Sequence, residues 1–153
     1  GLAGGVARAA VHAILRAGGM PIVFNRSRDR ADSLARWFSC ETQPLARLGA
    51  VGADVLINAT PVGMHPRTGE SPVDARLLPR FEWVVDTIYN PLQTRLLREA
   101  RAAGCGVVTG LSMFVRQGAE QIRTWTGLDP PVELMERVVR TALEAKDRLQ
   151  GPE

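Results

Sequence analysis

The sequence has 153 residues, of which 45% are hydrophobic and 23% charged, as in an ordinary globular domain with a core of its own. Its net charge of +3 accompanies only 5% aromatic residues, so it lacks the interleaved basic and aromatic clusters of a nucleic-acid-binding surface. No apolar run is long enough to span a membrane and nothing resembles a signal peptide, so we expect a cytoplasmic protein without membrane or nucleic-acid partners.

The first half of the chain predicts, in order, a helix over 6–17, a strand over 20–25, a helix over 27–38, and strands over 40–45 and 53–60. Gly18 and Gly19 end the first helix, whose apolar residues recur at helical spacing. Ser27 is placed as the N-cap of the second helix. The strand over 53–60 is a continuous apolar run, which we expect to be buried on both faces.

The second half predicts a Gly- and Pro-rich loop over 61–74, a strand over 82–89, a helix over 92–104, a strand over 105–110, and helices over 111–127 and 131–149. The last helix carries five apolar residues on one face, namely Met135, Val138, Val139, Ala142 and Leu149. Short apolar strands that alternate with helices predict an α/β fold, with a doubly wound parallel sheet and helices on both faces. We expect one further strand, central to this sheet, in front of Gly1.

No metal site is expected, because Cys40, Cys105, His12 and His65 lack ligand spacing. The two cysteines are interpreted as small core residues without a disulfide.

Two stretches suggest a dinucleotide site. Gly4 and Gly5 lack Cβ atoms and precede a helix whose free N–H groups and positive dipole end suit a pyrophosphate, although such a pair is often only a turn. The next strand ends in Asn25-Arg26-Ser27. At this strand end an acidic residue binds the ribose of NAD, whereas arginine accommodates the 2′-phosphate of NADP. The sequence therefore favours NADP, and a solvated arginine face stays the alternative.

Further motifs make the interpretation specific. "AGGVAR" followed by "NRSRDRA", then "INATPVGM" with "SPVD" downstream, "DTIYNPLQTRLL" and "GLSMFVRQGA" span almost the whole chain. Together they resemble the cofactor half of the shikimate dehydrogenases. The resemblance implies a Rossmann-like, three-layer fold and an enzyme that reduces 3-dehydroshikimate to shikimate with NADPH.

The resemblance also assigns residues. Those expected around the cofactor pyrophosphate are Ala3, Gly4, Gly5 and Val6. Those expected at the adenosine 2′-phosphate are Asn25, Arg26, Ser27 and Arg30. Those expected along the cofactor and its nicotinamide are Ala59, Thr60, Thr87 and Gly110, and those expected at the substrate are Tyr89 and Gln117. By its residue type, Met113 is added as an apolar residue at the nicotinamide ring.

The residue types agree with these last assignments. Met113 offers an apolar, adaptable surface, and Gln117 follows it by about one helical turn, where its amide can both donate to and accept from a polyhydroxylated acid. The alternatives are an exposed helix residue for Gln117 and a buried ring with a satisfied hydroxyl for Tyr89.

The remaining polar and aromatic candidates are interpreted as structural. Asp86 ends a strand and is expected to bond nearby backbone or Asn90. Trp37, Trp83 and Trp125 share no spacing and are interpreted as core or interface residues.

Two departures from the family pattern qualify the function. Either Leu2 replaces the first glycine of the family's glycine loop, or one residue of that loop is missing or displaced. The family's proton-transfer lysine and aspartate come from an N-terminal substrate domain, whereas Lys146 is the lysine of this chain. We therefore expect residues 1–153 to be the cofactor-binding domain of a larger enzyme, either single-function or fused to a dehydratase. The chain has no catalytic residue of its own and should be inactive alone.

Two other functions stay open. A quinate/shikimate dehydrogenase would use NAD. A non-catalytic NADP sensor would need no acid/base pair, although it would also need no substrate-reading residues such as Tyr89 and Gln117.

Overall fold

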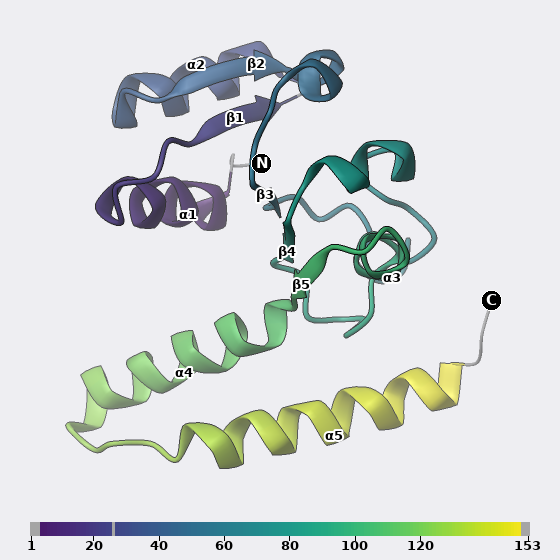
Figure 1. Cartoon of the computed structure of the whole chain (residues 1–153). Helices are drawn as coiled ribbons and strands as arrows, with labels where there is room; N and C mark the ends of the chain where they lie inside the picture. The colour runs from purple at the N-terminus through teal and green to yellow at the C-terminus, as the bar shows by residue number, and fades with distance from the viewer. Residues whose placement is uncertain (1–3, 26, 151–153) are drawn as a thin grey trace. The chain divides into compact units, whose positions relative to one another are not determined.

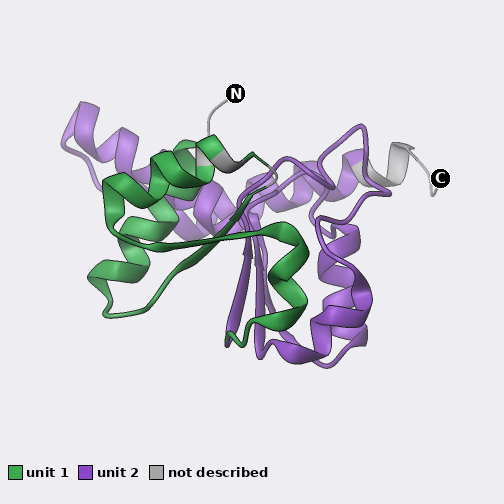
Figure 2. Ribbon diagram, turned by 90° about the horizontal axis from the view of Figure 1, so that it is seen from above, with its two compact units in different colours: residues 1–53 green, residues 54–153 purple. Residues whose placement is uncertain are grey.

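The computed structural model describes residues 4–25 and 27–150. They form two compact units, residues 1–53 and 54–153, which Figure 2 shows in different colours. Both units contain parallel strands and helices, which confirms the α/β class. Among the described residues, no helix has the length and apolar character that crossing a membrane requires.

The first unit is built on a two-stranded parallel sheet. Its elements are α1 (Gly5–Arg16), β1 (Ile22–Asn25), α2 (Arg28–Phe38), β2 (Glu41–Pro44) and the 3₁₀ helix η1 (Leu45–Ala50). Ile22 pairs with Glu41, and the register continues to the end of both strands. Helix α2 packs on both strands, with Ala31 and Leu34 buried.

The two helix boundaries of this unit follow the sequence signals. Helix α1 ends at Arg16, and Gly18 then takes a φ of 80°, a left-handed conformation that suits glycine. Ser27 is the N-cap of α2 by its extended backbone, but its side chain makes no capping hydrogen bond. Its N–H instead donates to Oδ1 of Asn25 at 3.1 Å, which shapes the turn between β1 and α2.

The second unit is built on a three-stranded parallel sheet in the order β3-β4-β5 (Figure 1). Its elements are β3 (Val55–Asn58), the 3₁₀ helix η2 (Ala75–Arg80), β4 (Trp83–Asp86), α3 (Arg95–Ala102), β5 (Gly106–Val108), α4 (Gly110–Thr126) and α5 (Val132–Gln150). Helix α3 packs on β4 and β5. The central strand β4 carries Val84, which is fully buried.

Strand β3 differs from the expectation. It was expected to be buried on both faces, but Val55 is 45% exposed and Leu56 and Ile57 are only half-buried. Among the described residues, β3 pairs with β4 on one side only, so its other edge has no partner strand there. An apolar run in sequence does not tell a central strand from an edge strand.

Helices α4 and α5 run side by side in opposite directions (Figure 1). The buried residues Leu92, Leu111 and Val115 form a cluster, against which partly buried residues pack: Phe114, Val132, Met135, Val139 and Leu143. The expected face of α5 was partly wrong, because Val138 and Ala142 are exposed and Leu143 packs instead. The side chain of Leu149 lies outside the described residues.

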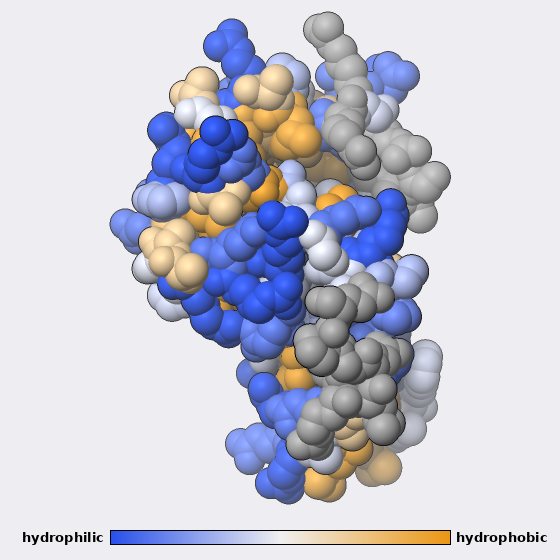
Figure 3. All heavy atoms as spheres, turned by 90° about the vertical axis from the view of Figure 1, so that its right-hand side faces the viewer, coloured by the Kyte–Doolittle hydropathy of each residue, from blue (hydrophilic) through white to orange (hydrophobic). Residues whose placement is uncertain are grey.

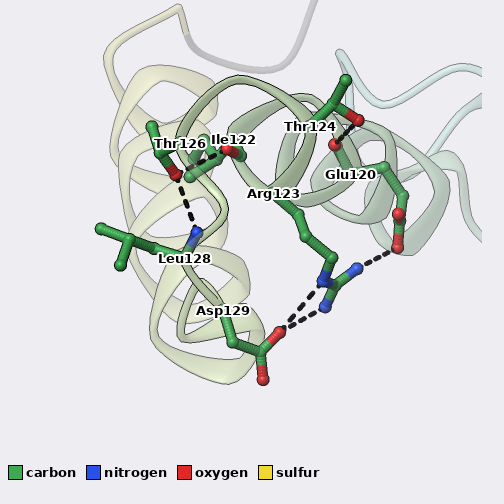
Figure 4. A network of polar contacts seen from close by, with 7 residues as sticks. All are labelled: Glu120, Ile122, Arg123, Thr124, Thr126, Leu128 and Asp129. Carbon is green, nitrogen blue, oxygen red and sulfur yellow. Dashed lines mark hydrogen bonds and ion pairs between the residues drawn. The ribbon is translucent and has the colours of Figure 1, made fainter.

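A polar network closes the turn between α4 and α5 (Figure 4). Arg123 lies between Glu120 and Asp129 and pairs with both carboxylates. The hydroxyl of Thr126 donates to the Ile122 carbonyl at 2.7 Å and accepts from the Leu128 N–H at 3.1 Å. Gly127, with a φ of 71°, ends α4 in the left-handed conformation. The reversal of the chain is thus fixed by local contacts.

The tryptophans do not lie in the core. Trp37 and Trp125 are 72% and 75% exposed, and Trp83 is 49% exposed, so the expectation of core positions was wrong. Trp37 stacks under the Arg8 guanidinium, which lies 5.0 Å from the ring centroid. Their assignment to an interface stays a prediction. On the face seen in Figure 3, hydrophilic residues predominate with small hydrophobic patches between them.

The cysteines divide between core and half-buried positions. Cys105 is buried as expected, and its Sγ donates to the carbonyl of Leu78 at 3.2 Å. Cys40 is half-buried, and burial raises the pKa of its thiol. Both thiols are free.

Candidate functional site

The carboxyl ends of β3 and β4 carry a buried polar network. The buried polar residues among the described part of the chain are Asn58, Asp86 and Thr94. Asn58 ends β3, Asp86 ends β4 and Thr94 caps α3. Their hydrogen bonds join "INATPVGM" to "DTIYNPLQT", two motifs that are 28 residues apart at Asn58 and Asp86. Buried polar groups of this kind are costly unless they are paired, so the network fixes one local geometry.

Asn58 organises the loop that follows its own strand. Its Oδ1 accepts from the Thr60 N–H at 3.0 Å and from the Thr60 hydroxyl at 2.7 Å. Its Nδ2 donates to the Val62 carbonyl at 3.3 Å and to Oδ1 of Asp86 at 3.1 Å. The Thr60 hydroxyl in turn accepts from the Val62 N–H at 3.2 Å. One amide therefore places Thr60, a predicted cofactor residue, and connects it to β4.

Asn58 also places Thr87 through its backbone. The carbonyl of Asn58 accepts from the Thr87 N–H at 3.1 Å and from the Thr87 hydroxyl at 2.9 Å. Because the hydroxyl proton is used in this bond, the Thr87 oxygen can act only as an acceptor towards a ligand. The predicted cofactor residues Thr60 and Thr87 are thus both anchored on Asn58.

Asp86 collects three donors. Its Oδ1 accepts from Asn58 and from the Ile88 N–H at 3.1 Å, and its Oδ2 accepts from the Thr94 hydroxyl at 2.6 Å. Burial raises the pKa of Asp86 above its ordinary value, and the three donors oppose the effect. The expected bond to nearby backbone is confirmed at Ile88, whereas the side-chain partners are Asn58 and Thr94 rather than Asn90.

Glycine is required where α4 begins. A Cβ on Gly110 would lie 2.4 Å from the carbonyl oxygen of Thr87 and 2.5 Å from that of Ile88, distances at which something must shift. The absence of a side chain lets the first turn of α4 lie directly against the end of β4. Thr87 and Gly110, both predicted to line the nicotinamide, are therefore in direct contact.

The other predicted residues of this unit follow the carboxyl ends of β3 and β4 or lie on α4, and their side chains differ in exposure. Tyr89 is 37% exposed, and its ring stacks on Phe114 with centroids 4.0 Å apart and an interplanar angle of 19°. The alternative of a buried Tyr89 ring was thus wrong. Met113 and Gln117 are both exposed on α4, and Ala59 is half-buried after β3.

In the first unit, the start of α1 suits an anionic ligand. Gly4 is its N-cap in an extended conformation, without a side-chain capping bond, and the first turn has no acidic residue. A Cβ on Gly5 would meet nothing within 4 Å, so the backbone there is open to a ligand. Free N–H groups at a helix N-terminus fit a pyrophosphate. Val6 is 38% exposed in the same turn.

The residues predicted at the adenosine 2′-phosphate are described in part. Asn25 ends β1 and, through its bond to the Ser27 N–H, sets the turn into α2. Arg30 belongs to the first turn of α2, but its side chain lies outside the described residues, as do the whole of Ala3 and Arg26. The arginine clamp for NADP therefore stays a prediction.

Sequence reasoning missed three residues that build the site. Asn58 had a signal, because it is a polar residue at the end of an apolar strand and lies within a family motif. Thr94 had a signal, because a threonine just before a helical run is a typical N-cap. In the structure its hydroxyl accepts from the Leu97 N–H at 3.3 Å. Phe114 had none, because its role depends on which ring packs against it. Among the described residues, no group of three or more His, Cys, Asp or Glu could hold a metal.

Comparisons with known proteins agree with the residue-level interpretation. The model of the shikimate 5′-dehydrogenase C-terminal domain matches residues 110–140. The shikimate dehydrogenase (NADP(+)) of Methanosarcina mazei is 45% identical over 152 residues, which cover 94% of this chain and 54% of that protein. Over nearly its whole length the chain is thus similar to the shikimate dehydrogenases, and the family model that it matches is that of their C-terminal domain.

Solved structures of the family share the fold. Shikimate 5-dehydrogenase from Thermus thermophilus, in complex with NADP(H) and shikimate, is 44% identical with a TM-score of 0.83, covering 93% of this chain and 53% of that one. Quinate dehydrogenase from Corynebacterium glutamicum, in complex with NAD, is 31% identical with a TM-score of 0.79, covering 90% and 52%. The chain spans about half the length of the relatives that it matches.

Proposed function

We propose that this chain is the NADP-binding domain of a shikimate dehydrogenase, which interconverts 3-dehydroshikimate and shikimate. The observation that carries the proposal is the Asn58–Asp86 network, which places Thr60 and Thr87 at the carboxyl ends of adjacent parallel strands. Ligands of α/β sheets bind at this edge. Gly110 supports it, since the first turn of α4 can lie against the carbonyl of Thr87 only without a Cβ at this position.

The residues proposed to bind the cofactor in the first unit would hold its negatively charged phosphate groups. The start of α1 at Gly4 and Gly5 would hold the pyrophosphate on backbone N–H groups. Arg26 and Arg30, with Asn25 and Ser27, would hold the adenosine 2′-phosphate, because guanidinium groups pair with phosphate through two hydrogen bonds. NADPH, when bound, supplies the hydride for the reaction.

The residues of the second unit orient the reactants. The Thr87 oxygen, whose proton is committed to Asn58, would accept from a donor such as the carboxamide of the nicotinamide. Met113 would cover the ring with an apolar surface. The Tyr89 hydroxyl and the Gln117 amide would hydrogen-bond the hydroxyl groups of the substrate. The proton-transfer groups are expected from a separate substrate domain, so this chain should bind ligands without turning them over.

A quinate dehydrogenase that uses NAD is the second candidate, favoured by the likeness to the Corynebacterium enzyme in complex with NAD. The two candidates differ at the strand end after β1. Arginine there favours NADP, whereas an NAD enzyme needs no phosphate clamp. A non-catalytic NADP sensor is disfavoured, because it needs no substrate-reading pair such as Tyr89 and Gln117.

Calorimetric titration of the purified chain with NADP and with NAD tests whether the chain prefers NADP, as proposed, or NAD, as a quinate dehydrogenase of this kind would. We expect Arg26→Ala to weaken NADP binding about tenfold or more and to leave NAD binding unchanged, because it removes charge-assisted hydrogen bonds to the 2′-phosphate. Arg36→Ala is the matched control, since it removes the same charge from the last turn of α2. Equal weak binding of both dinucleotides, or equal losses in both variants, would contradict the clamp.

A further inference from the structure

Two contacts tie the residues after β4 to the first turns of α4. Gly110 lies against the carbonyls of Thr87 and Ile88, where a Cβ would stand 2.4–2.5 Å away. Four residues later, the ring of Phe114 stacks on the ring of Tyr89, with centroids 4.0 Å apart. Residues four apart lie on the same side of a helix, so both contacts are made from one stripe of α4.

The stripe continues to Gln117, which follows Phe114 by three residues and is exposed. Phe114 itself is half-buried and packs against the buried cluster of Leu92, Leu111 and Val115. It therefore links a packed core on one side to the partly exposed ring of Tyr89 on the other. The side of α4 that carries Gln117 is thus the side on which Phe114 contacts Tyr89, so the two proposed substrate residues face the same side of this helix.

Stacking restricts what the Tyr89 ring can do. The side chain lies in a loop after β4, where no helix or strand limits its χ1 rotation. The hydroxyl oxygen lies on the axis of the ring, so its position depends on χ1, and a ring held at 19° to Phe114 cannot swing away without losing the stack. Offset or parallel aromatic pairs of this kind change equilibria about two- to tenfold.

We propose that Phe114 is the positioning residue of Tyr89, holding its hydroxyl for the hydroxylated acid on the side of α4 that carries Gln117. The inference rests on the proposed substrate role of Tyr89. Phe114 touches neither the substrate nor the cofactor in this account and acts through the tyrosine ring. Its loss should weaken the binding of shikimate and spare the binding of NADP.

The chain offers a clean probe for this test, because Tyr89 is its single tyrosine. Incorporated fluorotyrosine gives one fluorine NMR resonance, which reports on the Tyr89 ring alone. The ring current of Phe114 should displace this resonance from that of the free amino acid. Phe114→Leu should move it towards the free value, whereas Phe114→Trp, which keeps an aromatic ring and adds no tyrosine, should keep it displaced. Trp125→Leu, which removes an exposed aromatic ring from the same helix, should leave it unchanged.

The binding arm uses shikimate as the probe, titrated into the chain saturated with NADP and followed by the same resonance. We expect Phe114→Leu to raise the dissociation constant of shikimate about three- to tenfold, Phe114→Trp to keep it near the wild-type value, and NADP affinity to change less than about twofold in both variants. If Phe114 has only a structural role, Phe114→Leu weakens the binding of shikimate and of NADP to the same extent. That result overturns the proposal.

Other outcomes are equally decisive. If the resonance and the shikimate titration are both unchanged in Phe114→Leu, the stack with Phe114 does not position the Tyr89 ring. The wild-type resonance could stay unchanged when shikimate is added, while calorimetry still measures NADP binding. This result refutes the positioning role of Phe114 and does not affect the proposed binding of NADP. Failure to bind either ligand refutes the proposed function itself.

Discussion

Asp86 has no exposed surface, yet its carboxyl group accepts three hydrogen bonds from Asn58, Ile88 and Thr94. Replacing it with alanine leaves three buried donors unpaired, and each such donor costs about 1–3 kcal/mol. Asparagine keeps the shape and an oxygen for Asn58 and Ile88, while its amide nitrogen faces the Thr94 hydroxyl, which can also accept. Asp86→Asn therefore isolates the effect of the charge.

The sign of the pH dependence follows from the raised pKa of Asp86. Because burial raises it above the ordinary value of 3.8, the folded chain holds the proton more tightly than the unfolded chain. The stability gained from this proton is fully present below pH 3.8 and is lost as the pH rises through the raised pKa. We expect the unfolding free energy of wild type minus that of Asp86→Asn to fall as the pH rises from about 4 and then to level off. Urea unfolding at stepped pH measures this difference.

Asp74 supplies a control of opposite sign. Arg76, through its side-chain hydrogen bond, lowers the pKa of this exposed carboxyl to about 2. Its contribution is present above the ordinary value of 3.8 and is lost only as the pH falls towards 2. Asp74→Asn should therefore show a flat difference from wild type over the neutral range. A wild-type advantage over Asp86→Asn that grows with rising pH would mean that the three donors outweigh burial, contrary to this account.

At the scale of elements, the approach of α4 to the end of β4 depends on Gly110. Gly110→Ala places a Cβ 2.4 Å from a carbonyl oxygen, so the helix or the strand end must move. We expect a loss of about 1–3 kcal/mol in unfolding free energy, the usual cost of overpacking, and weaker NADP binding. Urea unfolding and NADP titration measure the two effects.

Gly118→Ala is the matched control on the same helix. A Cβ there meets only the terminal methyl of Met135 at 3.8 Å, an ordinary contact. The better helix propensity of alanine should leave stability unchanged or slightly higher. If both variants lose the same stability, the close approach at Gly110 has no special role.

The α-helices and strands could be predicted from the sequence, because they have local signals, whereas the 3₁₀ helices η1 and η2 were not predicted. Gly18 ends α1, Ser27 begins α2 and the apolar runs mark the strands within a few residues. The pairing of strands and the packed faces have no such signal. Val55 is exposed on a strand that pairs on one side only within the described residues, and Leu143 packs on α4 where Val138 does not. Both depend on contacts between distant segments.

The candidate site was predictable where it follows a motif and not where it follows packing. Thr60, Thr87 and Gly110 were predicted through the family pattern, and the structure shows the local contacts of each, while their role at the cofactor stays a prediction. The buried bond between Asn58 and Asp86 joins residues 28 apart in sequence, and the stack of Tyr89 on Phe114 joins two different elements. Spacing alone does not show such pairs.

At the scale of the whole molecule, residues proposed to bind the cofactor occur in both compact units, whereas proton-transfer residues are expected from a separate substrate domain. The chain covers about half the length of its relatives, consistent with a cofactor-binding part of a larger enzyme. Binding and chemistry should therefore be separable in this chain. The orientation of the reactants needs Thr87, Tyr89 and Gln117, but proton transfer needs groups that these residues do not supply.

An equilibrium titration of the purified chain with NADP, with NADPH absorbance read in the same sample after shikimate is added, separates cofactor binding from catalysis. We expect saturable NADP binding and no NADPH above the protein-free control. Steady NADPH formation that depends on shikimate would contradict the absence of a catalytic residue, and a chain that binds no NADP would contradict the proposed function.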